Sequence, residues 1–196
     1  MTFRQKWALK DFVYTQNADG TFNILAVKDL GIRRAEIPRG VVKIDEKVFF
    51  CCDGLTDVVL PEGLITISGQ SFGECVNLKA VKLPSTLERI GPYAFWRCRK
   101  LTELRIPERI CEICDAAFED CRSIKRVEFS NGIETIGVGA FYGCISLSEV
   151  YLPDGVKDVA ADAFRSYYGG PKIVSVPKTC RIDERAFSKD CKIILR

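Results

Sequence analysis

The most reactive side chains in this sequence belong to its ten cysteines, and the sequence contains no histidine. Cys111 and Cys114 have the C-x-x-C spacing of zinc knuckles and of thiol–disulfide redox motifs. A structural zinc site needs four ligands, and the chain has neither a second C-x-x-C pair nor a histidine to complete one. The sequence therefore predicts no metal and no cofactor at this pair.

The absence of histidine also removes the side chain that most often activates a catalytic nucleophile. Serine and cysteine nucleophiles are usually activated by a neighbouring histidine, and the sequence contains no glycine-rich phosphate loop either. Paired carboxylates catalyse glycoside hydrolysis by themselves in some enzymes. Here, however, the carboxylates alternate with apolar residues, at positions expected to be solvated surface. We therefore predict that the protein is not an enzyme.

The spacing of the cysteines points instead to a repeat. Five of them recur every 23 residues, at Cys52, Cys75, Cys98, Cys121 and Cys144, and seven phenylalanines share that interval, at Phe49, Phe72, Phe95, Phe118, Phe141, Phe164 and Phe187. An apolar period of this length is typical of a leucine-rich-repeat solenoid, in which stacked copies bury one continuous core. At such a position cysteine behaves as a small buried apolar residue, so we expect reduced thiols rather than disulfides.

The other repeat columns predict the elements of each coil. Aliphatic residues nine and eleven positions after each phenylalanine alternate with polar ones, which is the period of a strand, and a proline usually follows at position twelve. Aliphatic residues at positions fifteen and eighteen predict a second, shorter buried segment. In one copy these residues are Leu104, Ile106, Pro107, Ile110 and Ile113. Stacked strands would form a parallel sheet with neighbours ~4.8 Å apart.

The motif Ala94-Phe95-x-x-Cys98-x-x-Leu101 and its continuation to Pro107 resemble the BspA-like (Treponema-type) leucine-rich repeats. The resemblance extends over about residues 30–196. It implies a right-handed solenoid of 23-residue coils, α/β-type or mostly β, with a parallel sheet on its concave face. It also implies no catalytic residues and no cofactor. Members of the family are commonly bacterial or protozoan surface proteins that bind other proteins.

The two ends of the chain depart from the repeat. Apolar runs on either side of Asp19-Gly20 predict a β-hairpin, which we interpret as an N-terminal cap over residues 1–30, before one solenoid domain over residues 31–196. The apolar tail Lys192–Arg196 predicts a last strand with one free edge, which would permit weak self-association. Tyr167 and Tyr168 lie in an irregular copy and predict a loop.

Composition restricts the partners and the location. A net charge of +3 with both signs intermixed does not favour nucleic acid. No apolar run approaches the ~18 residues that span a membrane, so no membrane insertion is predicted. Residues 1–7 lack the apolar core of a secretory signal, which, with unpaired cysteines, predicts a cytoplasmic protein. A cell-surface or secreted location is the alternative if a signal has been removed.

Two surfaces are candidates for binding another protein. The first comprises the outward positions between the strand aliphatics, on the predicted concave face: Lys82, Glu103, Arg105, Arg126, Glu128, Glu149 and Tyr151. Their charges could neutralise each other from coil to coil or could select a complementary partner. The second is an aromatic ridge of Phe50, Trp96, Tyr142 and Tyr93, residue types that are frequent in binding hot spots. The alternative for the ridge is packing within loops.

These observations favour a non-enzymatic protein-binding module, such as an adaptor, an inhibitor or an effector, that acts through the solenoid surface. A bacterial or protozoan surface adhesin and a self-assembling structural scaffold are the alternatives. The partner is expected to be a protein, and the sequence does not identify it.

Overall fold

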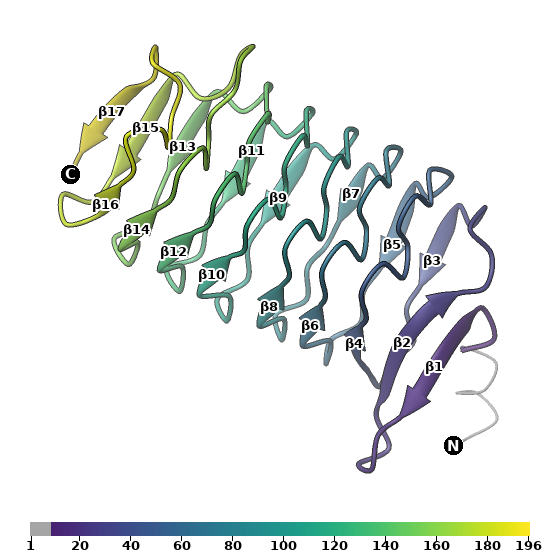
Figure 1. The fold of residues 1–196 in the computed structure, drawn as a ribbon. Helices are drawn as coiled ribbons and strands as arrows, with labels where there is room; N and C mark the ends of the chain where they lie inside the picture. The colour runs from purple at the N-terminus through teal and green to yellow at the C-terminus, as the bar shows by residue number, and fades with distance from the viewer. Residues whose placement is uncertain (1–8) are drawn as a thin grey trace.

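The structure is a computed structural model, and it describes residues 9–196. Within this range the chain forms strands and turns but no helix, and its coils stack into an elongated body (Figure 1). Residues 1–8, which include Trp7 and the segment that bears on a secretory signal, lie outside the described residues. The predicted solenoid of 23-residue coils with parallel strands is confirmed.

One row of parallel strands, the odd-strand face, is formed by the residues around positions nine and eleven. Its strands are β3 (Arg34–Glu36), β5 (Asp57–Val59), β7 (Ala80–Val81), β9 (Glu103–Arg105), β11 (Arg126–Glu128), β13 (Glu149–Tyr151), β15 (Ile173–Val176) and β17 (Lys192–Leu195). In β3, β5, β9 and β13 a buried central residue stands between two exposed ones, as in Leu104 between Glu103 and Arg105. This alternation places the polar residues of each coil outward, and the face corresponds to the predicted sheet.

The second row, the even-strand face, is the shorter segment predicted from positions fifteen and eighteen. Its strands are β4 (Val41–Ile44), β6 (Thr66–Ile67), β8 (Arg89–Ile90), β10 (Glu112–Ile113), β12 (Thr135–Ile136), β14 (Asp158–Val159) and β16 (Arg181–Ile182). Each coil thus contributes one strand to each face, and Figure 1 shows the two rows running side by side along the molecule.

The predicted N-terminal hairpin is present. Strands β1 (Phe12–Gln16) and β2 (Phe22–Val27) pair antiparallel, and β2 pairs parallel with β4, so the hairpin extends the even-strand face. Phe12 is buried, and its ring meets the first repeat phenylalanine, Phe49, at 6.2 Å and 77°. The hairpin therefore covers the open end of the core with apolar side chains, as a cap of a repeat array must.

The repeat phenylalanines form a continuous stack through the core. All seven are buried. Neighbouring rings lie nearly parallel, at 10° or less, with centroids 5.0 to 5.6 Å apart. This distance follows the spacing of the coils, because each ring comes from the same position of the next copy. The same phenyl ring therefore fills the core of each of these coils along the axis of the molecule.

The turns that carry these phenylalanines, here called the phenylalanine turns, form a third ladder between coils. The N–H of Phe72 donates to the carbonyl of Ala94 at 2.8 Å, and the N–H of Phe95 donates to that of Ala117 at 2.8 Å. The turns are tight, and residues two positions before and after the phenylalanine often have positive φ, as in Ala116 and Asp120. The ladder fixes the separation of consecutive coils beside the core.

Both strand rows are interrupted at the same coil boundary. The even-strand face divides into β1-β2-β4-β6-β8 and β10-β12-β14-β16, and the odd-strand face divides after β7 and again after β11. The shared interruption lies between the coil that begins at Phe72 and the one that begins at Phe95. The phenylalanine turns remain bonded there, since the N–H of Glu74 donates to the carbonyl of Trp96 at 2.7 Å.

One coil departs from the expected register. The chain pairs Val150 with Val174 and Tyr151 with Ser175, so the outward residues of β15 are Ile173 and Ser175. In the other copies the outward residues lie eight and ten positions after the phenylalanine, which from Phe164 would be Lys172 and Val174, but the Val174 side chain is fully buried. The loop of Tyr167 and Tyr168 contains one residue more than its counterparts, and a one-residue shift exchanges the two faces of a strand.

Candidate functional site

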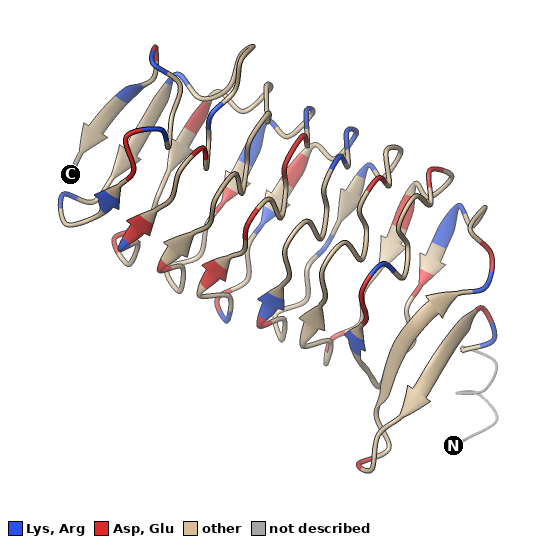
Figure 2. Cartoon of the chain, viewed as in Figure 1, with Lys and Arg blue, Asp and Glu red and all other residues tan. Residues whose placement is uncertain are grey.

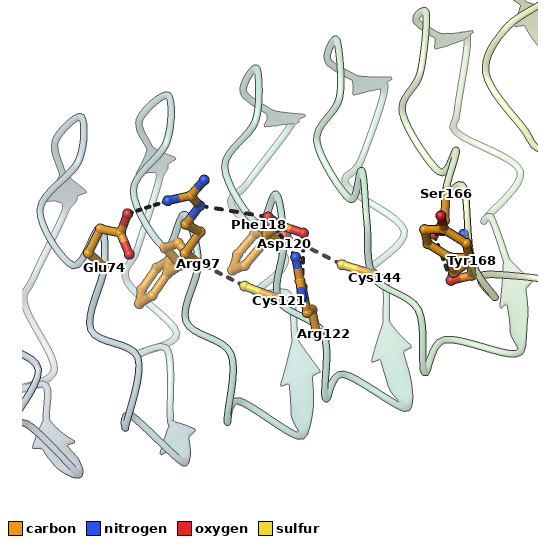
Figure 3. A network of polar contacts seen from close by, with 10 residues as sticks. Glu74, Arg97, Phe118, Asp120, Cys121, Arg122, Cys144, Ser166 and Tyr168 are labelled. Atoms are coloured by element: carbon orange, nitrogen blue, oxygen red, sulfur yellow. Dashed lines mark hydrogen bonds and ion pairs between the residues drawn. The ribbon is translucent and has the colours of Figure 1, made fainter.

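The cysteines of the repeat column are buried beside the phenylalanine stack. The thiol of Cys121 donates a hydrogen bond to the carbonyl of Phe95 at 3.1 Å, and that of Cys144 donates to Phe118 at 3.3 Å (Figure 3). Burial raises the pKa of Cys121 well above its ordinary value and that of Cys52 to about 11. The thiols are therefore protonated at neutral pH and act as small donors within the core.

The two cysteines of the C-x-x-C pair differ in their exposure to solvent. Cys111 is exposed and Cys114 is buried, and all ten cysteines are unpaired. Among residues 9–196, no group of three or more histidine, cysteine, aspartate and glutamate side chains is placed to hold a metal ion. The pair thus presents one accessible thiol.

This arrangement predicts the reactivity of each thiol. In the native protein we expect a thiol reagent to modify Cys51 and Cys111 rapidly, and Cys75, Cys98, Cys121 and Cys144 only after unfolding. Exclusion from solvent is the main cause, and a raised pKa adds to it because the thiolate is the reactive form. Peptide mapping by mass spectrometry after brief labelling measures both sets. Rapid native labelling of the four buried thiols would show that the column is open to solvent.

The odd-strand face brings four of the seven predicted concave-face residues to one place. Arg126, Glu128, Glu149 and Tyr151 line a shallow groove of about 720 Å³, together with Lys125, Val127, Phe129, Ser148, Val150, Ile173 and Ser175. The groove lies where β11 and β13 are not joined in one sheet. It therefore combines charged side chains with partly exposed apolar ones. Lys82 and Glu103 are also exposed, but they are not among its lining residues.

Ion pairs connect the charged residues of adjacent coils on this face. Glu128 accepts from Arg105 in the neighbouring strand at 2.7 Å and from Arg126 in its own strand at 3.2 Å. The expectation that charges on this face neutralise each other from coil to coil therefore holds for Arg105, Arg126 and Glu128. Glu149 makes no ion pair with any residue of the described part of the chain. The Arg105 side chain is 82% exposed, so its pair with Glu128 stays accessible to a partner.

Tyr151 is exposed as predicted, but it has a companion that the sequence did not indicate. The guanidinium of Arg196 lies over its ring at 4.0 Å and donates to its hydroxyl at 2.6 Å. Arg196 also pairs with Asp154 at 2.8 Å and donates to the carbonyl of Leu152. The residue after β17 thus reaches back across β15 to β13, and one edge of the groove is a tyrosine–arginine stack.

The aromatic ridge is a series of separate local contacts. Trp96 is half-buried, with the guanidinium of Arg97 over its ring at 4.4 Å and Tyr93 at 6.3 Å. Phe50 is half-buried, and the ring lies against Gly73 of the next coil. Arg97 in turn pairs with Glu74 at 2.8 Å and with Asp120 at 3.7 Å, as Figure 3 shows.

Tyr142, the last member of the ridge, contacts the irregular loop. Its ring meets Tyr167 edge-on at 6.1 Å, and burial followed by the hydrogen bond with Tyr167 raises its pKa to about 12. Tyr167 and Tyr168 are 74% and 84% exposed. The predicted loop is therefore present, and it offers more exposed aromatic surface than the ridge does.

Sequence reasoning missed three residues of the groove region. Ile173 and Ser175 were missed through the register shift, for which the late position of Pro177 was the available signal. Arg196 was missed because a side chain that returns across two strands leaves no trace in the repeat pattern.

Comparisons with known proteins address the fold. Residues 42–169 match, in six copies, the family model described as BspA type leucine-rich repeat region. No curated protein matches the chain. No helix among the described residues is long and apolar enough to cross a membrane.

Several solved bacterial structures resemble this one. A leucine-rich repeat protein from Bacteroides ovatus has 19% identity and a TM-score of 0.69, covering 94% of this chain and 66% of its own. The T. pallidum leucine-rich repeat protein has 23% identity and a TM-score of 0.53, with 85% and 83% covered. The pneumococcal vaccine antigen PcpA has 17% identity and a TM-score of 0.51, with 95% and 48% covered. At these identities the likeness concerns the fold.

Proposed function

Because this chain belongs to the BspA-type leucine-rich repeat family, we propose that it is a non-enzymatic module that binds another protein through its odd-strand face. Repeats of this kind typically mediate protein–protein interaction and present a rigid, extended surface. The module would act as an adaptor, an inhibitor or an effector. The groove beside β11 and β13 is the observation that carries the proposal.

The groove has the composition expected of a protein-binding surface. Tyr151 and Ile173 supply exposed apolar area, while Arg126 and Glu149 supply charges of opposite sign at its rim. These side chains project from strands, so little order is lost when a partner binds. Tyrosine and arginine are frequent in hot spots, and here they are stacked together at Tyr151 and Arg196.

The proposal predicts a loss of binding after charge reversal. The double variant Arg105→Glu, Arg126→Glu should weaken binding of the native partner by about tenfold or more, because Arg126 at the groove and Arg105 on the neighbouring strand both become acids beside Glu128. The unfolding midpoint should change little, since exposed ion pairs contribute only ~0.2–1 kcal/mol each. Affinity capture identifies the candidate partner, and titration of the purified partner gives the dissociation constants.

A matched control is available on the other side of the molecule. Lys47 and Arg89 are exposed cations outside the odd-strand face, and Lys47→Glu, Arg89→Glu makes the same change in net charge. This control should bind as the wild type does. If both double variants bind normally while Trp96→Ala binds weakly, the aromatic ridge is the binding surface and the groove is not.

Two alternatives remain as further candidates. PcpA is a vaccine antigen, and a surface adhesin role for this chain is the second candidate, which fractionation of cells from the native source distinguishes from a cytoplasmic role. A self-assembling scaffold is the third, supported by the exposed apolar side chains Ile193, Ile194 and Leu195 of the edge strand β17. Light scattering over a range of concentrations distinguishes this alternative.

A further inference from the structure

Exposed cations gather on the turns that lead into three neighbouring strands of the odd-strand face. Lys79 precedes β7, Arg99 and Lys100 precede β9, and Lys125 precedes β11. All four side chains are exposed, and none makes an ion pair or hydrogen bond with residues 9–196. Figure 2 shows lysine and arginine on these turns. We call these four residues the basic edge.

Backbone hydrogen bonds place the four residues close together. The N–H of Lys125 donates to the carbonyl of Thr102 at 2.9 Å, and the N–H of Thr102 donates to that of Lys79 at 3.4 Å. Lys79, Thr102 and Lys125 therefore occupy the same position in three successive coils, so the two lysines are ~10 Å apart. Arg99 and Lys100 belong to the middle coil. The fold thus gathers charges that are spread over 47 residues of a segment with mixed charge.

The neighbouring charges do not neutralise the basic edge. Arg122 and Arg126 flank it, but each is already paired, with Asp120 and Glu128, both at 3.2 Å. Asp57, Glu103 and Glu149, on β5, β9 and β13, are the other nearby carboxylates, and none of them makes an ion pair with the described residues. None of these carboxylates is paired with Lys79, Arg99, Lys100 or Lys125 in the part of the chain that the structure describes.

The basic edge differs from the cations of this chain that are paired between coils, because it groups four unpaired cations on three successive coils. Several cations meet an acid of a neighbouring coil, both on the middle coil itself, as in Arg97–Glu74, Arg105–Glu128 and Arg109–Glu88, and further along the chain, as in Lys157–Glu134 and Arg181–Asp158. Like charges on adjacent strands are unfavourable, and folding gains nothing from them. A site where the local rule fails without a compensating gain is one to examine for a role in binding.

We propose that the basic edge binds an acidic stretch of the protein partner. This inference rests on the proposed function, because it names the chemistry of a partner that also occupies the groove. The two surfaces adjoin, since Lys125 belongs to the basic edge and also lines the groove. Arg99 can hold a carboxylate with two parallel hydrogen bonds, while the three lysines act as point charges. Contacts at such an exposed rim mainly accelerate encounter and depend on salt.

The same observations favour protein carboxylates over nucleic acid. A duplex carries one negative charge per ~1.7 Å, and its binding requires a basic surface that continues along the backbone. The basic edge extends over only three coils, with Glu103 beside its middle and Asp120 and Glu128 at its flank. These acids would repel a uniformly charged polyanion. An acidic peptide can place its carboxylates between them, because its charges are separated and mobile.

The test uses a fluorescein-labelled octaglutamate peptide and fluorescence anisotropy. Wild-type protein should bind the peptide at about 10 mM salt and lose most of this affinity at about 150 mM, as the screening length falls from ~30 to ~8 Å. The quadruple variant Lys79→Gln, Arg99→Gln, Lys100→Gln, Lys125→Gln should bind at least about tenfold more weakly at low salt. Circular dichroism checks that this variant is folded.

The control variant is Arg33→Gln, Arg39→Gln, Lys178→Gln, Lys189→Gln, which removes four exposed cations at other positions. It should retain affinity within about twofold, since it has the same net charge as the quadruple variant but an intact basic edge. Equal loss in both variants would overturn the proposal, as would absence of binding by the wild type at low salt. Tighter, edge-dependent binding of a single-stranded oligonucleotide than of the peptide would overturn the assignment to protein carboxylates.

The assay is independent of the native partner. Its failure would leave the groove proposal in place, and failure of the Arg105 and Arg126 variants to affect partner binding would leave the result for the basic edge in place. The two proposals can therefore be refuted separately.

Discussion

Replacement of Phe118 by alanine should lower the free energy of unfolding by ~3–5 kcal/mol. The ring is fully buried and lies between Phe95 at 5.3 Å and Phe141 at 5.4 Å. The neighbouring coils are unable to close the cavity, because the backbone bond from Phe118 to Ala140, at 2.9 Å, holds their separation. A cavity that cannot collapse gives the full loss of packing. Urea denaturation measures the effect.

The matched control for this prediction is Phe187→Ala at the other end of the stack. Phe187 has one stacked neighbour, Phe164, at 5.6 Å, and it is 7% exposed. A terminal coil opens locally at a lower free energy than a central one, so its cavity is relieved by fraying. The cost should be clearly smaller. Equal costs for the two variants would contradict a core in which each coil depends on both neighbours.

The second large effect is expected from a glycine in the turn that follows β11. A side chain at Gly132 would place its Cβ atom 2.1 Å from the carbonyl oxygen of Glu108 in the preceding coil. Ser130 holds this turn close, because its hydroxyl donates to the carbonyl of Pro107 at 3.0 Å. Gly132→Ala must push the two coils apart, and we expect a loss of ~1–3 kcal/mol, the usual range for overpacking.

Gly31→Ala serves as the comparison for Gly132→Ala. The nearest atom to its added Cβ would be a carboxylate oxygen of Asp29 at 3.2 Å, the end of a side chain that can rotate away. Thermal or chemical denaturation should show a change within about 0.5 kcal/mol for this variant. If the two variants are equally stable, the close approach of the coils at Gly132 is not rigid.

The sequence predicted what recurs in every copy. Phenylalanine every 23 residues defined the coil, and the alternation around positions nine and eleven predicted which side chains of β9 and β13 face outward. These predictions succeeded because each column has one environment in all coils, so each copy is a separate observation of the same packing. The hairpin cap was predicted because its two apolar runs around Asp19-Gly20 do not follow the repeat and have the pattern of a β-hairpin.

What the sequence did not predict depends on single positions. The extra residue before Pro171 reversed the faces of Val174 and Ser175, and counting from the preceding phenylalanine hid the shift. The contact of Arg196 with Tyr151 joins residues 45 apart that share no column. The sequence places Arg99, Lys100 and Lys125 in a basic run on successive coils, but only the structure shows that they stay unpaired while Arg122 and Arg126 pair with acids. Contacts within one column, between residues 23 apart, follow from the repeat, as the phenylalanine stack does, whereas contacts between different columns do not.

The coinciding interruptions of the two strand rows have a mechanical consequence. Beyond the core contacts, a stack bonded along three lines resists bending in every direction, whereas between the Phe72 and Phe95 coils only the phenylalanine turns keep a regular ladder. We therefore expect bending to be easiest at that boundary, with the intact turns as its axis. In such bending, Phe72 and Phe95, whose rings are 5.1 Å apart, would lie close to the axis. A partner that contacts both halves would find their relative angle adjustable, while each half keeps its own shape.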